Sequence, residues 1–260
     1  IRAENSYLFH DKSNRSEPFI TFAKAAAGKQ GPTQPKLKTP DQFKIMGKRV
    51  ERFDIPAKVD GSAVFGVDID LPGMKYACVK CAPVFGSTVS TVDGSSAEKM
   101  AGVVKVVNLG TGVGVIADTY WQAKKALDTV NVTYTKGESN RVSSATMFEQ
   151  FGKSMDAAVA NGDEQDDYKL GSARKVLASA DKVIEAEYRV PHLAHATMEP
   201  MNCTAWAHDD KLEIWSGLQN PLGIRNLLAE ELEFDRERVV INNVYLGGGF
   251  GRRAMDDYPV

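Results

Sequence analysis

Hydrophobic and polar residues repeat with two different periodicities along this chain, and these predict a mixture of strands and helices. Alternation of apolar and polar residues is typical of a strand, whereas apolar residues three and four apart are typical of a helix. Strands are predicted over residues 62–70, 75–84, 103–107, 112–117, 129–134, 182–190, 202–207, 212–216 and 239–246. Helices are predicted over residues 95–100, 119–127, 147–160, 173–179 and 221–232. This mixture of elements predicts an α+β fold.

Changes in the patterning divide the chain into four stretches. Residues 1–45 are polar and weakly patterned, and they become rich in Gly, Pro and Lys, which predicts an extended arm or linker. Residues 46–140 are predicted to form a small α+β domain, and residues 141–170 a linker that carries a helix. Residues 171–260 are predicted to be the first part of a second domain. We expect this domain to be incomplete, because a strand and loop pattern continues up to the last few residues.

The composition is that of an ordinary soluble globular protein, with 43% hydrophobic and 25% charged residues and a formal net charge of −2. This charge balance argues against a nucleic-acid-binding protein, which usually has a strongly basic face. Three cysteines are too few, and odd in number, for a disulfide framework. Cys78 and Cys81 have the spacing of redox and metal motifs, but in a strand such positions point to opposite faces. We therefore interpret them as structural.

The most informative segment for chemistry is Leu246-Gly-Gly-Gly-Phe-Gly-Arg-Arg253, which follows a predicted strand. Glycines allow positive φ angles and close approach of a ligand to the backbone, and successive amides can bind an anion. Arg252 and Arg253 add donors suited to an oxyanion, and Phe250 adds a ring that could cover a flat group. A glycine-rich bend with two solvated arginines would have the same sequence. The spacing is not that of the dinucleotide or P-loop fingerprints.

Two histidines and a glutamate near residue 195 also suggest chemistry. His192 and His195 could hold a metal if they lay on one helix with Glu199 nearby, but the flanking sequence does not predict a helix. We therefore assign no metal ligand and favour histidines held by backbone hydrogen bonds. Glu199 could face a reaction site or pair with a nearby cation.

The glycine-rich segment resembles the Gly-Gly-Phe-Gly loop of the xanthine dehydrogenase and aldehyde oxidase superfamily, the molybdenum hydroxylases. Its two arginines are similar to the branch of isoquinoline 1-oxidoreductase beta subunits and membrane-associated aldehyde dehydrogenases. In xanthine dehydrogenases Gly-Lys-Glu commonly follows this loop, so the chain departs from the purine-oxidising pattern. Residues 47–66, 71–77 and 83–86 resemble the start of the family's α/β hammerhead domain. Residues 193–204 and 215–221 resemble the start of its molybdopterin-binding region.

The resemblance implies an α/β hammerhead-like domain followed by the start of a molybdopterin-binding mixed α/β domain. It also implies a molybdenum-dependent oxidoreductase, whose family hydroxylates a carbon next to a ring nitrogen, or oxidises an aldehyde, with oxygen taken from water. The cofactor implied is molybdopterin, as the molybdenum cytosine dinucleotide, with iron–sulfur (2Fe-2S) clusters on a partner subunit.

Site residues carry over by position. Those that match the family's cofactor contacts are Gln219, Gly248, Gly249, Phe250, Gly251 and Arg252, the last as a cofactor or partner contact. The family's general base is a glutamate that we expect downstream, so no catalytic residue is assigned within this chain.

The resemblance favours hydroxylation of an N-heteroaromatic, isoquinoline-like substrate. Two alternatives stay open: an aldehyde dehydrogenase of the same superfamily, and a noncatalytic binding or assembly fragment. The partners implied are the small 2Fe-2S subunit, the remainder of the large subunit and a small-molecule substrate, but no nucleic acid. A c-type cytochrome is a further candidate partner. We expect the protein in the periplasm or at its membrane face, and otherwise in the cytoplasm.

Overall fold

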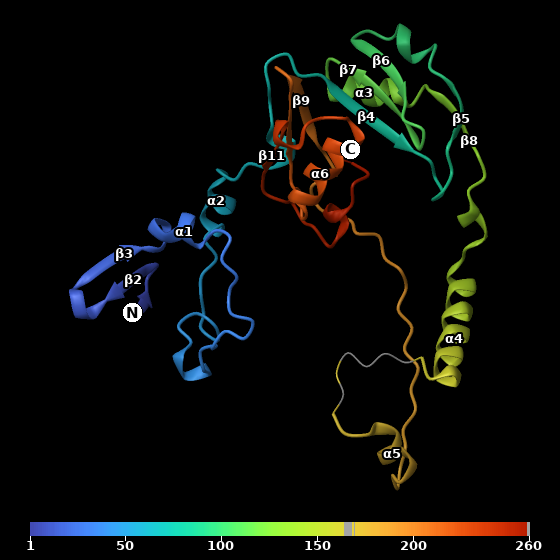
Figure 1. The fold of residues 1–260 in the computed structure, drawn as a ribbon. Helices are drawn as coiled ribbons and strands as arrows, with labels where there is room; N and C mark the ends of the chain where they lie inside the picture. The colour runs from blue at the N-terminus through green and yellow to red at the C-terminus, as the bar shows by residue number, and fades with distance from the viewer. Residues whose placement is uncertain (164–167, 169, 259–260) are drawn as a thin grey trace. The chain divides into compact units, whose positions relative to one another are not determined.

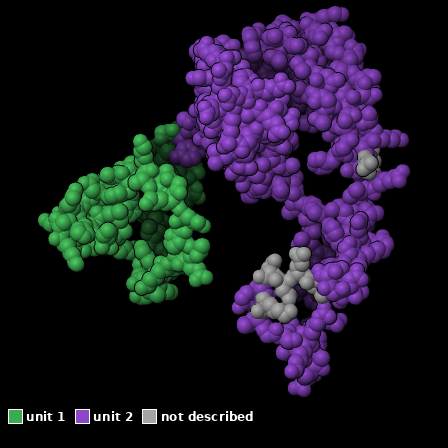
Figure 2. Space-filling view, viewed as in Figure 1, with its two compact units in different colours: residues 1–62 green, residues 63–260 purple. Residues whose placement is uncertain are grey.

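The computed structural model describes residues 1–163, 168 and 170–258. Its two compact units are Ile1–Ser62 and Ala63–Val260 (Figure 2). The predicted domain boundaries near residues 46, 140 and 170 stay predictions. Of the predicted linker, residues 164–167 and 169 lie outside the described residues.

The first unit differs from the extended arm that the sequence predicts, because its first residues form a small antiparallel sheet. The strands are β1 (Arg2–Glu4), β2 (Tyr7–His10) and β3 (Arg15–Pro18), paired in that order. Asn5 and Ser6 join β1 to β2 with φ angles of 46° and 65°, the left-handed pair that suits a two-residue hairpin. Two short helices follow, α1 (Ala23–Ala26) and α2 (Ile55–Asp60). The Gly- and Pro-rich residues 29–39 contain no helix or strand, as expected.

The second unit contains a first body built on an antiparallel sheet in the order β4-β7-β6 (Figure 1). Its strands are β4 (Tyr76–Cys81), β6 (Val103–Asn108) and β7 (Gly112–Ala117), and a separate pair is formed by β5 (Val89–Asp93) and β8 (Asn131–Tyr134). The helix α3 (Tyr120–Leu127) begins at Thr119, whose side chain caps it, and packs on β4 and β7. The central strand β7 is almost wholly buried, which explains its unbroken run of glycine and apolar residues.

A second body contains three strands in the order β11-β10-β9, with α6 (Pro221–Glu231) packed against β11 (Figure 1). Here β9 (Thr204–His208) is antiparallel to β10 (Lys211–Ser216), and β11 (Val239–Asn243) is parallel to it. A parallel pair needs a crossover, and α6 provides it. The side chain of Asn220 caps α6, and Pro221 takes its first position. The apolar core contains Leu212, Ile214, Leu218, Ile224, Leu228, Ala229 and Val239.

Because β10 and β11 are parallel, their carboxyl ends lie at the same edge of the sheet. The segments that follow them, residues 217–219 and 244–253, therefore meet there. This edge is where ligands bind in sheets of this kind. The remaining helices are α4 (Ser144–Asn161), capped by Ser143, and α5 (Ala173–Ala178). No described helix has the length and apolar character needed to cross a bilayer.

Two predicted strands are wrong. Residues 62–70 contain only an isolated bridge between Phe65 and Tyr245, because the Asp68 carboxylate accepts the Phe65 amide and folds Gly66–Asp68 into a 3-10 turn. Residues 182–190 alternate as a strand would, but no described strand pairs with them. Three further elements are clearly shorter than predicted: β4 spans only Tyr76–Cys81, β11 ends at Asn243, and the helix expected over residues 95–100 is a 3-10 turn, Ala97–Lys99.

The α6 helix provides a matched test of the second body's core. Leu228 is 1% exposed, whereas Leu222 on the same helix is 68% exposed. We expect Leu228→Ala to lower the free energy of unfolding by about 2–5 kcal/mol, because it leaves a cavity. The control Leu222→Ala should change it by less than about 0.5 kcal/mol. Urea denaturation of both variants measures the difference, and equal effects would contradict the packing described.

Candidate functional site

The glycine loop, residues 246–253, follows β11 at the carboxyl edge of the sheet. Three of its residues have left-handed backbone conformations: Gly248 with φ 106°, Phe250 with φ 53° and Gly251 with φ 86°. Two of the three are glycines, as expected for such angles. Phe250 adopts its angle despite its side chain, and its ring is 70% exposed. The ring is therefore available to cover a bound group.

Some amides of the loop are held by the protein and others are free. The amide of Gly247 donates to Glu199 Oε2 (2.9 Å), and that of Gly251 donates to Gln219 Oε1 (3.0 Å). Between them, the amides of Gly248, Gly249 and Phe250 donate to no acceptor within the described part of the chain. Successive amides without a protein acceptor are the kind of donors that bind an anion or an oxygen ligand.

Close packing around the loop explains two of its glycines. A Cβ atom at Gly247 would lie 2.2 Å from the Cβ atom of Glu199. A Cβ atom at Gly249 would lie 2.9 Å from Gln219 Oε1 and 3.0 Å from its Cδ. Any side chain at either position would displace a neighbour, so the loop backbone lies against the protein on one side.

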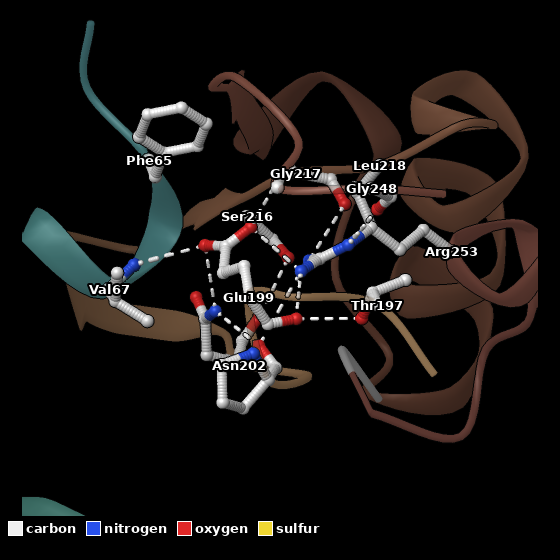
Figure 3. A network of polar contacts seen from close by, with 12 residues as sticks. Phe65, Val67, Thr197, Glu199, Asn202, Ser216, Gly217, Leu218, Gly248 and Arg253 are labelled. Atoms are coloured by element: carbon white, nitrogen blue, oxygen red, sulfur yellow. Dashed lines mark hydrogen bonds and ion pairs between the residues drawn. The ribbon is translucent and has the colours of Figure 1, made fainter. Parts of the chain in front are cut away.

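Glu199 occupies the centre of the polar network in Figure 3. Its Oε1 accepts from the amide of Val67 (3.3 Å) and from Asn202 Nδ2 (3.0 Å). Its Oε2 accepts from the amide of Gly247 (2.9 Å) and from Arg253 Nη2 (2.7 Å). The carboxylate is buried and all four donors converge on it. Of the two interpretations that the sequence left open, the structure therefore supports pairing with a cation.

Arg253 is the cation, and its side chain is completely buried. Besides Glu199 Oε2, its guanidinium donates to the carbonyl oxygens of Gly248 (Nε, 2.9 Å), Glu199 (Nη2, 2.9 Å) and Gly217 (Nη1, 3.4 Å). Arg253 thus joins the segment after β10, the segment before β9 and the glycine loop. No sequence pattern separates this residue from its neighbour, and sequence reasoning missed its role.

Arg252 has a different environment. It forms a bidentate ion pair with Asp257 (2.6 and 2.8 Å), and its Cζ lies 5.9 Å from the centre of the Tyr258 ring. Neither arginine is therefore simply solvated. The interpretation of Arg252 as a cofactor or partner contact stays a prediction.

Gln219 lies beside the loop, between β10 and α6. Its amide donates to the carbonyl of Arg253 (3.0 Å), and its side-chain oxygen accepts from Gly251. The structure thus brings Gln219 together with Gly249 and Gly251, two of the residues that the resemblance implied by position. Their contact with a cofactor stays a prediction.

The cysteines and histidines outside the loop have the following environments. Cys78 packs against the first body's core while Cys81 is exposed, which confirms that they point to opposite faces of β4. Burial raises the pKa of the Cys203 thiol to about 12. His192 and His195 are exposed, and the His192 ring lies 6.4 Å from that of Phe151. Within the described residues, no three His, Cys, Asp or Glu side chains are grouped so as to hold a metal.

Comparison with known families defines the class of domain. Residues 156–260 match the family of molybdopterin cofactor-binding domains, and this span includes Glu199, Gln219 and the whole glycine loop. The match confirms the molybdopterin-binding domain that the sequence resemblance predicted.

Curated relatives include the two kinds of protein that the resemblance named, an isoquinoline 1-oxidoreductase beta subunit and a membrane-associated aldehyde dehydrogenase. The membrane-bound aldehyde dehydrogenase (pyrroloquinoline-quinone) of Gluconacetobacter polyoxogenes is 31% identical over 86% of this chain and 30% of its own length. The isoquinoline 1-oxidoreductase subunit beta of Brevundimonas diminuta is 30% identical over 84% of this chain and 28% of its own. The chain is thus similar to these two oxidoreductases, and it spans roughly 30% of the length of the curated relatives that it matches.

Solved structures agree at the level of the fold. The quinoline 2-oxidoreductase from Pseudomonas putida 86 matches with a TM-score of 0.57 and 16% identity, over 80% of this chain and 31% of that one. The aldehyde oxidoreductase from Desulfovibrio gigas matches with a TM-score of 0.57 and 18% identity, over 79% and 28%. These likenesses, with the mixed helices and sheets, confirm the predicted α+β class.

The raised pKa of Cys203 predicts a difference in thiol reactivity. At about pH 8 a free thiol is partly ionised and reacts with alkylating agents, whereas a thiol with this pKa is almost wholly protonated. In the native protein we expect iodoacetamide to modify Cys81 and to spare Cys203, with both modified after unfolding in urea. Peptide mass spectrometry measures the two sites separately. Equal modification of Cys203 and Cys81 in the native protein would contradict the burial described.

Proposed function

We propose that this chain contributes one wall of the molybdopterin-cofactor site of an oxidoreductase that hydroxylates an N-heteroaromatic, isoquinoline-like substrate. The observation that carries the proposal is the run of free amides at Gly248, Gly249 and Phe250. They lie at the carboxyl edge of β10 and β11, within the span that matches the molybdopterin cofactor-binding family.

The residues of the loop fit such a group. A molybdenum cofactor presents oxygen ligands and phosphate, and both accept hydrogen bonds from backbone amides. The loop offers three free donors, and two of them, Gly248 and Gly249, have no side chain in the way. The Oε1 atom of Gln219 is occupied by Gly251, which leaves its amide nitrogen as a further donor. Phe250 carries an exposed ring that can shield the bound group from water.

When bound, the molybdenum cofactor supplies a metal that activates water and accepts the electrons of the substrate. The part of this chain would be to bind and orient that group: the free amides would donate to its oxygen atoms, Gln219 would add a donor, and Phe250 would exclude solvent. Glu199 takes no part as a base, because Arg253 and three other donors occupy its oxygens. We propose that the general base is a glutamate elsewhere in the large subunit.

The relatives favour a second candidate function, aldehyde oxidation. The aldehyde dehydrogenase and the isoquinoline oxidoreductase match this chain with nearly equal identity, 31% and 30%. A direct assay compares N-heteroaromatics with aldehydes under a dye acceptor, using the complete enzyme. Turnover of aldehydes alone would overturn the proposed substrate class.

We further propose the partners that the resemblance implied: a 2Fe-2S small subunit, the remainder of the large subunit and, as a further candidate, a c-type cytochrome. We propose the periplasm or its membrane face as the location. The cofactor form proposed is the cytosine dinucleotide. Co-purification with metal analysis, nucleotide release by acid hydrolysis and cell fractionation test these points separately. A mature enzyme without molybdenum would overturn the catalytic proposal and favour a noncatalytic binding or assembly role.

Substitution at Gly249 tests the cofactor wall directly. We expect Gly249→Val to displace Gln219 and narrow the site, since its Cβ would lie 2.9 Å from Gln219 Oε1. Overpacking of roughly 1–3 kcal/mol would weaken cofactor retention by about five- to 150-fold. Elemental analysis of the complete enzyme measures molybdenum per large subunit. The control Gly152→Ala, where a Cβ meets nothing within 4 Å, should leave the metal content unchanged. Wild-type molybdenum content in Gly249→Val would count against the loop assignment.

A further inference from the structure

Each free amide of the glycine loop belongs to a peptide unit whose other half is a carbonyl. In a planar trans peptide unit the C=O of one residue and the N–H of the next point in opposite directions. Whatever holds the carbonyl therefore fixes the direction of the following amide. For the amides of Gly248, Gly249 and Phe250, the controlling carbonyls are those of Gly247, Gly248 and Gly249.

All three carbonyls are held. The main-chain amide of Glu199 donates to Gly247 O (3.1 Å), and the main-chain amide of Arg252 donates to Gly249 O (2.9 Å). Only the middle carbonyl, Gly248 O, is held by a side chain, through Arg253 Nε at 2.9 Å. The direction of the Gly249 amide thus depends on one buried guanidinium.

The guanidinium is itself fixed by Glu199 (Figure 3). Arg253 Nη2 lies 2.7 Å from Glu199 Oε2, and the side chains are 0% and 5% exposed. The other carboxylate oxygen binds the amide of Val67, in the Gly66–Asp68 turn. A buried pair of charges needs every remaining donor and acceptor satisfied, and main-chain groups together with Asn202 Nδ2 supply these bonds.

We propose that Arg253 and Glu199 are positioning residues for the cofactor site. Arg253 orients the amide of Gly249 by holding the carbonyl of Gly248, and Glu199 acts through Arg253 while joining the loop to the Gly66–Asp68 turn. This inference rests on the proposed function for the identity of the ligand, but the positioning itself concerns only residues of this chain.

The key variant is Arg253→Lys. It keeps a positive charge beside Glu199, so the carboxylate stays paired. A single ammonium nitrogen cannot reproduce the fork that reaches both Glu199 and Gly248 O. In the complete enzyme we expect cofactor retention to fall roughly ten- to a hundred-fold, the usual effect of removing a group that orients a metal site's ligands. The Mo(V) electron paramagnetic resonance signal should change, and amides of the 247–252 peptide should exchange hydrogen several-fold faster.

Two controls separate positioning from loss of stability. Arg225 also donates Nε and Nη2 to a carbonyl, that of Arg236, and none of its described hydrogen bonds reaches the loop. Arg225→Lys should therefore leave the molybdenum content, the resonance signal and the exchange of the loop unchanged. Leu228→Ala lowers stability without touching the loop, and should leave the resonance signal of the loaded enzyme unchanged.

Glu199→Gln is the second test variant. Its side chain has the same shape, but its amide group would face two donors at whichever end it occupied. We expect the same changes as in Arg253→Lys, with a larger loss of stability. If Glu199→Gln fails to fold, the results for Arg253→Lys alone test the positioning role. Wild-type retention, resonance signal and exchange in Arg253→Lys would overturn the proposal.

Failure of the proposed function gives a different result. A wild-type complete protein without molybdenum would reject the cofactor, while hydrogen exchange in wild type and Arg253→Lys would still test the positioning. Unchanged exchange of the loop peptide would then overturn the inference independently of any metal.

Discussion

Burial of one carboxylate with one guanidinium is the constraint on which the arrangement of this site depends. Removing two charges from water costs several kcal/mol for each ion, so such a pair persists only with near-complete hydrogen bonding. Glu199 and Arg253 meet this requirement by using the main chain of the segments around them. The hydrogen bonds of this pair join four separate stretches of backbone, those around Val67, Glu199, Gly217 and the glycine loop. Contacts with the rest of the protein therefore hold the loop, and such contacts are what preorganised recognition requires.

The sheet supplies the place for this pair. Parallel pairing of β10 and β11 requires a crossover, and α6 begins at Pro221, directly after its cap Asn220. Gln219 is thus confined between the end of a strand and the start of a helix, where it has little freedom to move from the loop. The hydrogen bond from Gly251 to its side chain follows from that confinement. Local helix-start chemistry and nonlocal strand pairing together bring the two segments into contact.

Much of the fold could be predicted from the sequence, because the relevant signals are local. The buried strand β7 is an apolar run, and α6 has a capping asparagine followed by proline. Residues 182–190 show the limit of this reasoning. Their alternation is typical of a strand, but a strand exists only if another pairs with it, and pairing is not encoded within the segment. The strand predicted over residues 62–70 is wrong for a local reason. The Asp68 carboxylate accepts the Phe65 amide, and the backbone forms a 3-10 turn there in place of a strand.

The candidate site could be predicted from the sequence only in part. The glycine loop and Gln219 could be found from motif and resemblance, and the structure brings them together. The roles of Arg252 and Arg253 could not be distinguished, because adjacent residues of the same type differ only in what surrounds them. Arg253 meets Glu199, 54 positions earlier, whereas Arg252 meets Asp257, five positions later. No pattern within the loop contains that information.

The same separations have a kinetic consequence. The entropy needed to close a loop grows with the length of chain between its ends, so contacts between distant residues are late events in folding. Arg253 and Glu199 are 54 residues apart, and Val67 and Glu199 are 132 apart. Hairpins such as β9–β10 join residues only a few positions apart and can form much earlier. We therefore expect the amides of the glycine loop to acquire their final directions late in folding, after the hairpins have formed.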